Sequence, residues 1–223
     1  MIHATNISKA YNKKIILDNI DFSASVGESI AIVGRNGAGK STFLSILTGY
    51  LRPDSGSVSL TGGNISFCPQ QDNLFEELSA YDNLLFWARA KGRPLDLDGM
   101  ELAKLFNIHE YAHKKVRHLS GGMKKCVAIL CALSGGADIL VLDEPFSGLD
   151  IFYKDVLLKA FDELKSLGKC IIYTSHNIDE ITGLDNKIYT LAGGKLTHID
   201  IDTLNKDSGY DAVRKSLLEH SHS

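Results

Sequence analysis

The segment of this chain best suited to chemistry is a glycine-rich stretch that ends in a lysine and two hydroxyl residues. It matches the pattern G-x-x-x-x-G-K-[ST] in full. Glycines let backbone N–H groups wrap around phosphate oxygens, a lysine adds a point charge for the β and γ phosphates, and the adjacent serine hydroxyl is a Mg²⁺ ligand. We therefore predict a nucleotide phosphate site made of Gly34, Arg35, Asn36, Gly37, Ala38, Gly39, Lys40, Ser41 and Thr42, with Ser41 on the metal.

Two acidic residues supply the second half of such a site. Residues 139–142 are all apolar, and Asp143 and Glu144 follow them directly. Because ligands collect at the carboxyl ends of strands in open α/β sheets, both carboxylates are expected beside the phosphate loop. Asp143 would hold Mg²⁺, directly or through water, and Glu144 would orient or deprotonate an attacking water.

The elements that must position these residues alternate between strands and helices. Strands are predicted at residues 2–8, 15–25, 29–33, 57–60, 64–68, 139–142, 170–174 and 187–191. Helices are predicted at residues 41–51, 84–90 (capped by Ser79), 100–106 (capped by Asp98), 123–133, 154–167, from about 177, and 209–219. Gly62 and Gly63 between two short strands indicate a hairpin. The pattern predicts an α/β core with a mainly parallel sheet, a β layer at its start and a helical insert in its middle.

Composition narrows the class of protein. The chain has 223 residues, 44% hydrophobic and 23% charged, which is typical of a globular protein. Its net charge is -3, from 24 Lys+Arg against 27 Asp+Glu, which gives no support for a nucleic-acid partner. A local basic cluster at 113–118 and 124–125 is interpreted as a solvated helical face.

The sequence also indicates the cellular compartment of the protein. No apolar stretch approaches the roughly 20 residues of a spanning helix, and the N-terminus shows no signal-peptide pattern. Cys68, Cys126, Cys131 and Cys170 form no CxxC pair. Buried, reduced thiols are expected rather than disulfides or a metal site, which indicates the cytoplasm.

A further motif separates this chain from most proteins with a phosphate loop. Leu119, Ser120, Gly121, Gly122 and Met123 stand at the start of a predicted helix. Here the sequence resembles the ATP-binding cassette (ABC) family, whose signature is L-S-G-G-Q. A serine hydroxyl and two glycines at a helix N-terminus suit an anion. Within one chain that site is redundant with the phosphate loop, so it is expected to face the γ-phosphate of a nucleotide held by a second molecule.

The resemblance assigns roles to four more residues. Tyr11 lies 23 residues before Gly34, where the family stacks an aromatic ring on adenine; a tyrosine packed at a strand end is the alternative. Gln70 matches the glutamine whose loop joins the core to the insert and which lies near Mg²⁺ and the attacking water. Gln71 is a rival, and Gln70 is preferred because it directly follows Pro69. Asp150, in Ser147-Gly148-Leu149-Asp150, matches the loop that crosses the dimer interface, and His176 matches the family's switch histidine.

One position departs from the family pattern. Met123 replaces the usual glutamine and cannot make amide hydrogen bonds. Because the serine and both glycines are intact, weakened ribose-side contacts are expected rather than lost activity. The L-S-G-G-M variant also looks like one seen in cassettes of exporters.

Taken together, the resemblance implies a P-loop NTPase core with an N-terminal antiparallel β subdomain and a helical insert. Residues 1–223 would form one ABC ATPase domain, with the core at about 1–71 and 136–223 and the helical part at about 72–135. The implied function is an ATP-hydrolysing subunit of an ABC transporter that closes head to tail, with a second copy or a homologous subunit, over two Mg-ATP. It would act on an integral membrane permease encoded separately, for export, from the cytoplasmic face of the membrane. The alternatives are a non-transport single cassette, such as an iron–sulfur cluster assembly ATPase, and a regulatory cassette without turnover.

Overall fold

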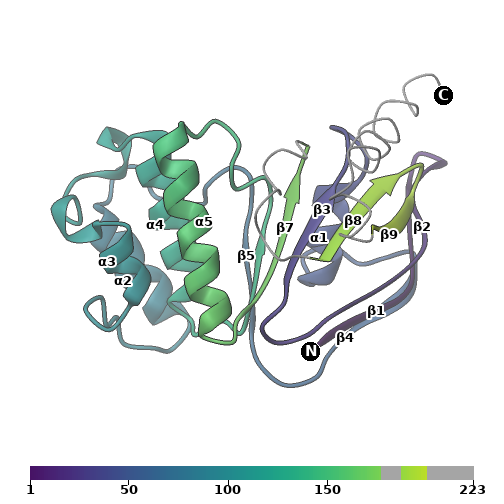
Figure 1. Cartoon of the computed structure of the whole chain (residues 1–223), viewed down its shortest axis with the longest axis horizontal. Helices are drawn as coiled ribbons and strands as arrows, with labels where there is room; N and C mark the ends of the chain where they lie inside the picture. The colour runs from purple at the N-terminus through teal and green to yellow at the C-terminus, as the bar shows by residue number, and fades with distance from the viewer. Residues whose placement is uncertain (177–186, 200–223) are drawn as a thin grey trace.

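The computed structural model describes residues 1–176 and 187–199 (Figure 1). The helices predicted from about 177 and at 209–219 lie outside the described residues. Seven of the eight predicted strands keep their position to within about two residues at each end, and the first extends three residues further than predicted. Among the seven are the strands around the phosphate loop: β3 (Ser29–Val33), β6 (Ile139–Leu142), β7 (Cys170–Ser175) and β8 (Lys187–Ala192).

The described residues form two β-sheets. A three-stranded antiparallel sheet has the order β2 (Lys14–Ala24), β1 (Ile2–Tyr11), β4 (Ser55–Leu60). A six-stranded sheet has the order β5 (Ile65–Cys68), β6, β7, β3, β8, β9 (Lys195–Ile199). Its first five strands are parallel and β9 is antiparallel to β8. Every residue of β3, β6 and β7 is buried, as expected of parallel strands covered on both faces.

The predicted hairpin around Gly62 and Gly63 is wrong. β4 pairs with β1, whereas β5 pairs with β6 in the other sheet. Gly62 and Gly63 have φ values of 70° and 79°, and this left-handed turn carries the chain from one sheet to the other. The backbone N–H of Asn64 donates to Asp138, and a Cβ on Gly63 would lie 2.8 Å from the same carboxylate, so the turn is held against the residues before β6.

Five helices are described: α1 (Lys40–Leu47), α2 (Ala80–Ala90), α3 (Glu101–Leu105), α4 (Gly121–Leu133) and α5 (Ile151–Ser166), with short 3-10 turns at Ile108–Glu110 and Val116–His118. Ser79 caps α2 as expected, by accepting from the backbone N–H of Asp82. The predicted cap Asp98 is wrong, because α3 begins after Met100 and has no side-chain cap.

Successive side chains of the central strands point to opposite faces of the sheet, and each face packs into its own hydrophobic core. Ala31, Leu140 and Tyr173 lie in the core formed with α2 to α5, whereas Ile32, Val141 and Ile172 lie in the core formed with α1 and the antiparallel sheet. Figure 1 shows α2 to α5 gathered beyond β5 and β7, on the opposite side from β1, β2 and β4. Of these helices, α2, α3 and α4 lie between β5 and β6 in the chain, where the sequence predicts a helical insert, and α5 follows β6. All four cysteines are buried free thiols.

Candidate nucleotide site

The glycine-rich loop lies at the carboxyl end of β3 and leads directly into α1. Gly37 and Gly39 have φ values of 81° and 103°, which side chains rarely adopt. A Cβ on Gly34 would lie 2.6 Å from the carbonyl oxygen of Leu191 in β8. The backbone N–H of Gly34 donates to the carbonyl of Ser175 in β7. The two strands beside β3 therefore fix the start of the loop.

Lys40 is buried at the start of α1, with only 6% of its surface exposed. Its Nζ donates to the carbonyl oxygen of Gly34 at 2.7 Å and forms an ion pair with Glu144 Oε1 at 3.0 Å. The two motifs that lie about a hundred residues apart in sequence thus meet at one ammonium group.

The two acidic residues after β6 are both bound by Thr174, a residue that belongs to none of the sequence motifs. Thr174 Oγ1 donates to Asp143 Oδ1 at 2.6 Å and accepts from the backbone N–H of Glu144 at 2.9 Å. The backbone N–H of Asp143 donates to the carbonyl of Cys68 in β5. The signal for Thr174 was a hydroxyl residue at the carboxyl end of the fully buried strand β7, where Thr174 and Ser175 follow Cys170, Ile171, Ile172 and Tyr173.

Glu144 contacts a cation or imidazole through each carboxylate oxygen. Its Oε2 lies 2.5 Å from His176 Nδ1, while Oε1 pairs with Lys40. Burial alone would raise the pKa of Glu144, but the hydrogen bonds and charges of Lys40 and His176 outweigh it, so the pKa lies below its ordinary value. Glu144 also has a φ of 49°, a left-handed conformation that is strained for a residue with a side chain.

One cavity brings most of the predicted nucleotide residues together. Its lining includes Tyr11, which is 47% exposed at the end of β1, and Gln70 after β5. Among the described residues around the cavity Gln70 is present and Gln71 is not, which favours Gln70 for the proposed role. The full lining is Tyr11, Ile16, Asn36, Gly37, Gly39, Lys40, Ser41, Thr42, Gln70 and Glu144. Arg35 and Ala38 face a neighbouring groove beside Lys14 and Leu191.

The signature residues form a second location at the starts of α4 and α5. Ser120 caps α4 by accepting from the backbone N–H of Met123 at 3.2 Å. Asp150 caps α5 by accepting from the backbone N–H of Tyr153 at 2.9 Å. A Cβ on Gly122 would lie 2.2 Å from the Tyr153 ring, whereas one on Gly121 would meet nothing within 4 Å. Within the described part of the chain, the lining of the Lys40 cavity includes none of the signature residues and not Asp150.

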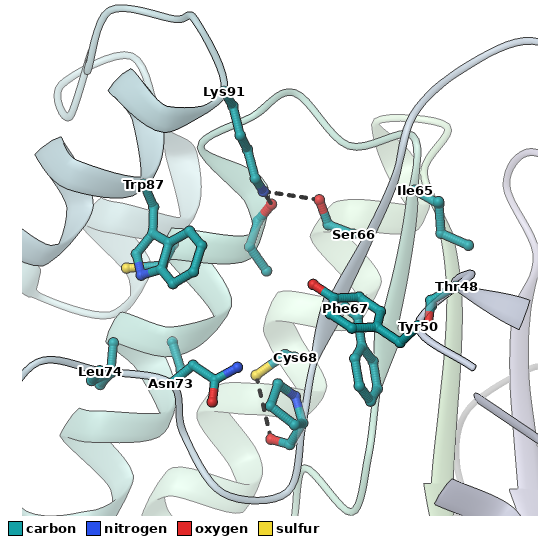
Figure 2. Close-up of a pocket in the computed structure, with 14 residues that line it drawn as sticks. Thr48, Tyr50, Ile65, Ser66, Phe67, Cys68, Asn73, Leu74, Trp87 and Lys91 are labelled. Carbon is teal, nitrogen blue, oxygen red and sulfur yellow. Dashed lines mark hydrogen bonds between the residues drawn. The ribbon is translucent and has the colours of Figure 1, made fainter. Parts of the chain in front are cut away.

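A separate groove lies next to the Gln70 loop, between β5 and helices α2 and α4. Figure 2 shows Trp87 and Lys91 facing it across from Phe67 and Cys68. Lys91 Nζ donates to Ser66 Oγ and to the carbonyl of Ala132, which ties α2, β5 and α4 together at one end of the groove.

Within residues 1–176 and 187–199, no helix has both the length and the apolar character needed to span a bilayer.

Comparison with known proteins gives concordant matches. A family model described as ABC transporter matches residues 17–147. The chain is 34% identical over 217 residues to the linearmycin resistance ATP-binding protein LnrL of Bacillus subtilis, covering 91% of this chain and 70% of that protein. It is 35% identical over 207 residues to a Nod factor export ATP-binding protein I of Burkholderia orbicola, covering 85% and 67%. The chain thus spans about two thirds of the length of these relatives.

Solved structures share the fold over nearly the whole chain. An ATP-binding subunit of an ABC transporter superimposes with a TM-score of 0.85 at 25% identity, covering 98% of this chain and 99% of that one. A dimeric ATP-binding cassette bound to ADP and Pi gives a TM-score of 0.77 at 25% identity, covering 88% and 96%. The architecture expected from the sequence, an α/β cassette with an antiparallel β subdomain, is confirmed.

Proposed function

The chain belongs to the ATP-binding cassette family of ABC transporters, and from that premise we propose that two copies of it close head to tail over two Mg-ATP molecules. It is the ATP-binding subunit of an ABC transporter, and its activity is that of an ABC transporter ATPase. The observation that carries the assignment of ATP hydrolysis is the contact of Glu144 with both Lys40 and His176 at the phosphate loop. This contact places the lysine proposed to bind phosphate beside the carboxylate proposed as the base.

The chain's own residues divide the work of hydrolysis. Backbone N–H groups of 34–42 bind the phosphates, and Lys40 adds charge to them. Glu144 accepts the proton of the attacking water; its pKa lies below the ordinary glutamate value, so it is ionised at neutral pH. His176, bound to the other oxygen of Glu144, holds that carboxylate in position. Tyr11 offers its half-exposed ring to adenine.

We assign the Mg²⁺ to the oxygens of Ser41, Asp143 and Gln70. A hydroxyl, a carboxylate and an amide oxygen are the hard donors that Mg²⁺ prefers, so the residue types fit. When bound, the ion neutralises charge on the phosphates. Thr174 donates to one oxygen of Asp143, so it restricts the orientation of the carboxylate that would bind the ion.

The second copy would complete each site. Ser120 and Gly121 lie at the start of α4, away from the residues that line the Lys40 cavity, and Gly121 has open space where a Cβ would be. In a head-to-tail pair they would meet the γ-phosphate held by the partner, and Asp150 would lie at the same interface. The dimeric cassette among the similar structures supports the pairing of two copies.

We propose an integral membrane permease as the further partner, with the subunit on its cytoplasmic face. The groove beside the Gln70 loop is the proposed contact, because Asn73 and Leu74 of that loop form part of its wall and a segment seated there would act on Gln70. The relatives named above serve linearmycin resistance and Nod factor export, which supports export and disfavours the iron–sulfur assembly alternative.

The test is Glu144→Gln in the full chain. The amide keeps the shape of the side chain but does not accept the proton, so turnover should fall by at least about a hundredfold while ATP binding is retained. The variant should accumulate as a dimer when Mg-ATP is added, measured by light scattering. Turnover near the wild-type rate would contradict the role given to Glu144.

A further inference from the structure

The basic cluster at residues 113–118 and 124–125 was interpreted from the sequence as a solvated helical face. In the structure, four of its cations form ion pairs with one acidic loop. Three acidic residues of the loop after Gln70 pair with the cluster: Asp72 with Lys125, Glu76 with Lys124, and Glu77 with Lys115 and Arg117. Backbone bonds run along the same path, from Val116 N–H to the Leu78 carbonyl and from Arg117 N–H to the Glu76 carbonyl. The far end of this loop is thus held by the backbone as well as by charge.

Lys125 differs from the other cations of the cluster because it is buried. Its side chain is 7% exposed and that of Asp72 is 18%, whereas Glu76 and Glu77 are 65% and 68% exposed. Lys125 Nζ lies 2.6 Å from Asp72 Oδ1 and also donates to the carbonyl oxygen of Gln70 at 3.3 Å. A buried ion pair is a poor source of stability, since desolvation offsets its attraction, so its value lies in fixing one geometry.

Lys125 connects the signature helix α4 to the Gln70 loop. It lies in α4, five residues after the cap Ser120, and it is the side chain of α4 that binds the backbone of Gln70 itself. Exposed pairs further along the loop do not reach Gln70. Gln70 lines the nucleotide cavity, so Lys125 joins a residue of that cavity to the helix that begins with the signature.

We propose that Lys125 is a positioning residue for ATP hydrolysis, which holds the Gln70 loop against the signature helix through the Gln70 carbonyl and Asp72. This inference rests on the proposed function for its kinetic consequence. Lys125 does not touch the nucleotide; it acts through Gln70. Its loss should therefore release the loop and impair turnover without weakening ATP binding.

The first test is amide hydrogen exchange of the full chain. Lys125→Met should accelerate exchange in residues 69–77 by about tenfold, because opening of this segment no longer breaks a buried pair. Lys124→Met is the matched control: it is the adjacent residue and pairs with the same loop, but its pair is exposed, so exchange should stay within about twofold of wild type. Unchanged exchange in Lys125→Met would overturn the proposal.

The second test is a kinetic double-mutant cycle with Gln70→Ala. Lys125→Met alone should lower kcat for ATP by about tenfold and leave KM within about twofold. In the Gln70→Ala background, Lys125→Met should have no further effect, since its path to the reaction is already cut. An equal fall of kcat in both backgrounds would show that Lys125 acts only on general structure and would overturn the proposal.

A second variant guards against misfolding. Lys125→Met leaves Asp72 without its cation, whereas Lys125→Met with Asp72→Asn removes both charges and still removes the donor to Gln70, so the same exchange and kinetic results are expected. The exchange arm needs no turnover. A wild-type chain that failed to hydrolyse Mg-ATP would count against the proposed function, and the exchange in residues 69–77 would still decide the role of Lys125.

Discussion

At the scale of single residues, Glu144 takes part in more of the contacts at the site than any other residue described above. Its side chain contacts Lys40 and His176, its backbone N–H donates to Thr174, and its backbone has a left-handed φ of 49°. A non-glycine residue in this conformation carries strain that the surrounding contacts must outweigh. The strained backbone aims the carboxylate between the phosphate loop and β7, so function and not stability explains why a glutamate stands here.

This strain predicts an unusual order of stability for two substitutions. Glu144→Ala and Glu144→Gly both remove the side-chain contacts, but only glycine adopts a φ of 49° without steric cost. The glycine variant should therefore be more stable than the alanine variant by about 1 kcal/mol, which is about 2–4 °C in melting temperature for a chain of this size. Thermal unfolding of both variants measures the difference; an alanine variant that is the more stable one would contradict the strain.

Motif residues were predictable from the sequence because their types and spacing carry chemistry on their own. Lys40, Glu144 and Gln70 lie at one cavity as expected. Thr174 and Lys125 were not selected, since their roles depend on which distant residues the fold places beside them: Asp143 for Thr174, and the Gln70 carbonyl for Lys125. Burial also decides the role of Lys125, and charge patterning alone had placed it on a solvated surface.

At the scale of elements, pairing was harder to predict than position. The strands β4 and β5 occur close to where their sequence patterns indicate, but they join different sheets. A glycine pair favours a tight turn, yet the pairing of the strands on either side of it depends on the partners available: β1 offers an edge to β4, and β6 offers one to β5. Strand partners are long-range information that a local pattern does not contain.

The starts of α4 and α5 give a prediction at the same scale. Gly122 lies against the ring of Tyr153, where a Cβ would come within 2.2 Å of it, while Gly121 faces open space. Gly122→Ala should destabilise the chain by about 1–3 kcal/mol, because the ring must move. Gly121→Ala, the matched control, should be neutral or raise stability by about 0.5 kcal/mol through helix propensity. Denaturant unfolding of the two variants distinguishes them, and equal stabilities would show that Tyr153 does not constrain this position.

At the scale of the whole molecule, the separation of the two candidate half-sites matters most. The Lys40 cavity is formed at the carboxyl ends of β3, β5 and β6, and the signature lies at the start of α4, which belongs to the helical segment between β5 and β6. The helical segment and the sheet share one hydrophobic core, so the signature does not reach the cavity without large rearrangement of that core. A second copy is the simpler way to bring Ser120 to a phosphate.

The separation predicts that two inactive variants complement each other. Lys40→Ala removes the phosphate cation from its own cavity, and Ser120→Arg blocks the signature that the chain presents to its partner, so each variant alone should lose ATP turnover. In a mixed dimer one site is defective on both sides, while the other combines an intact phosphate loop with an intact signature. Random pairing makes half of the dimers mixed, each with one intact site of two, so an equimolar mixture should recover up to about a quarter of the wild-type rate. Steady-state phosphate release measures the recovery. Activity that only equals the mean of the two separate variants would mean that each nucleotide site is built within a single chain, and the head-to-tail dimer would be wrong.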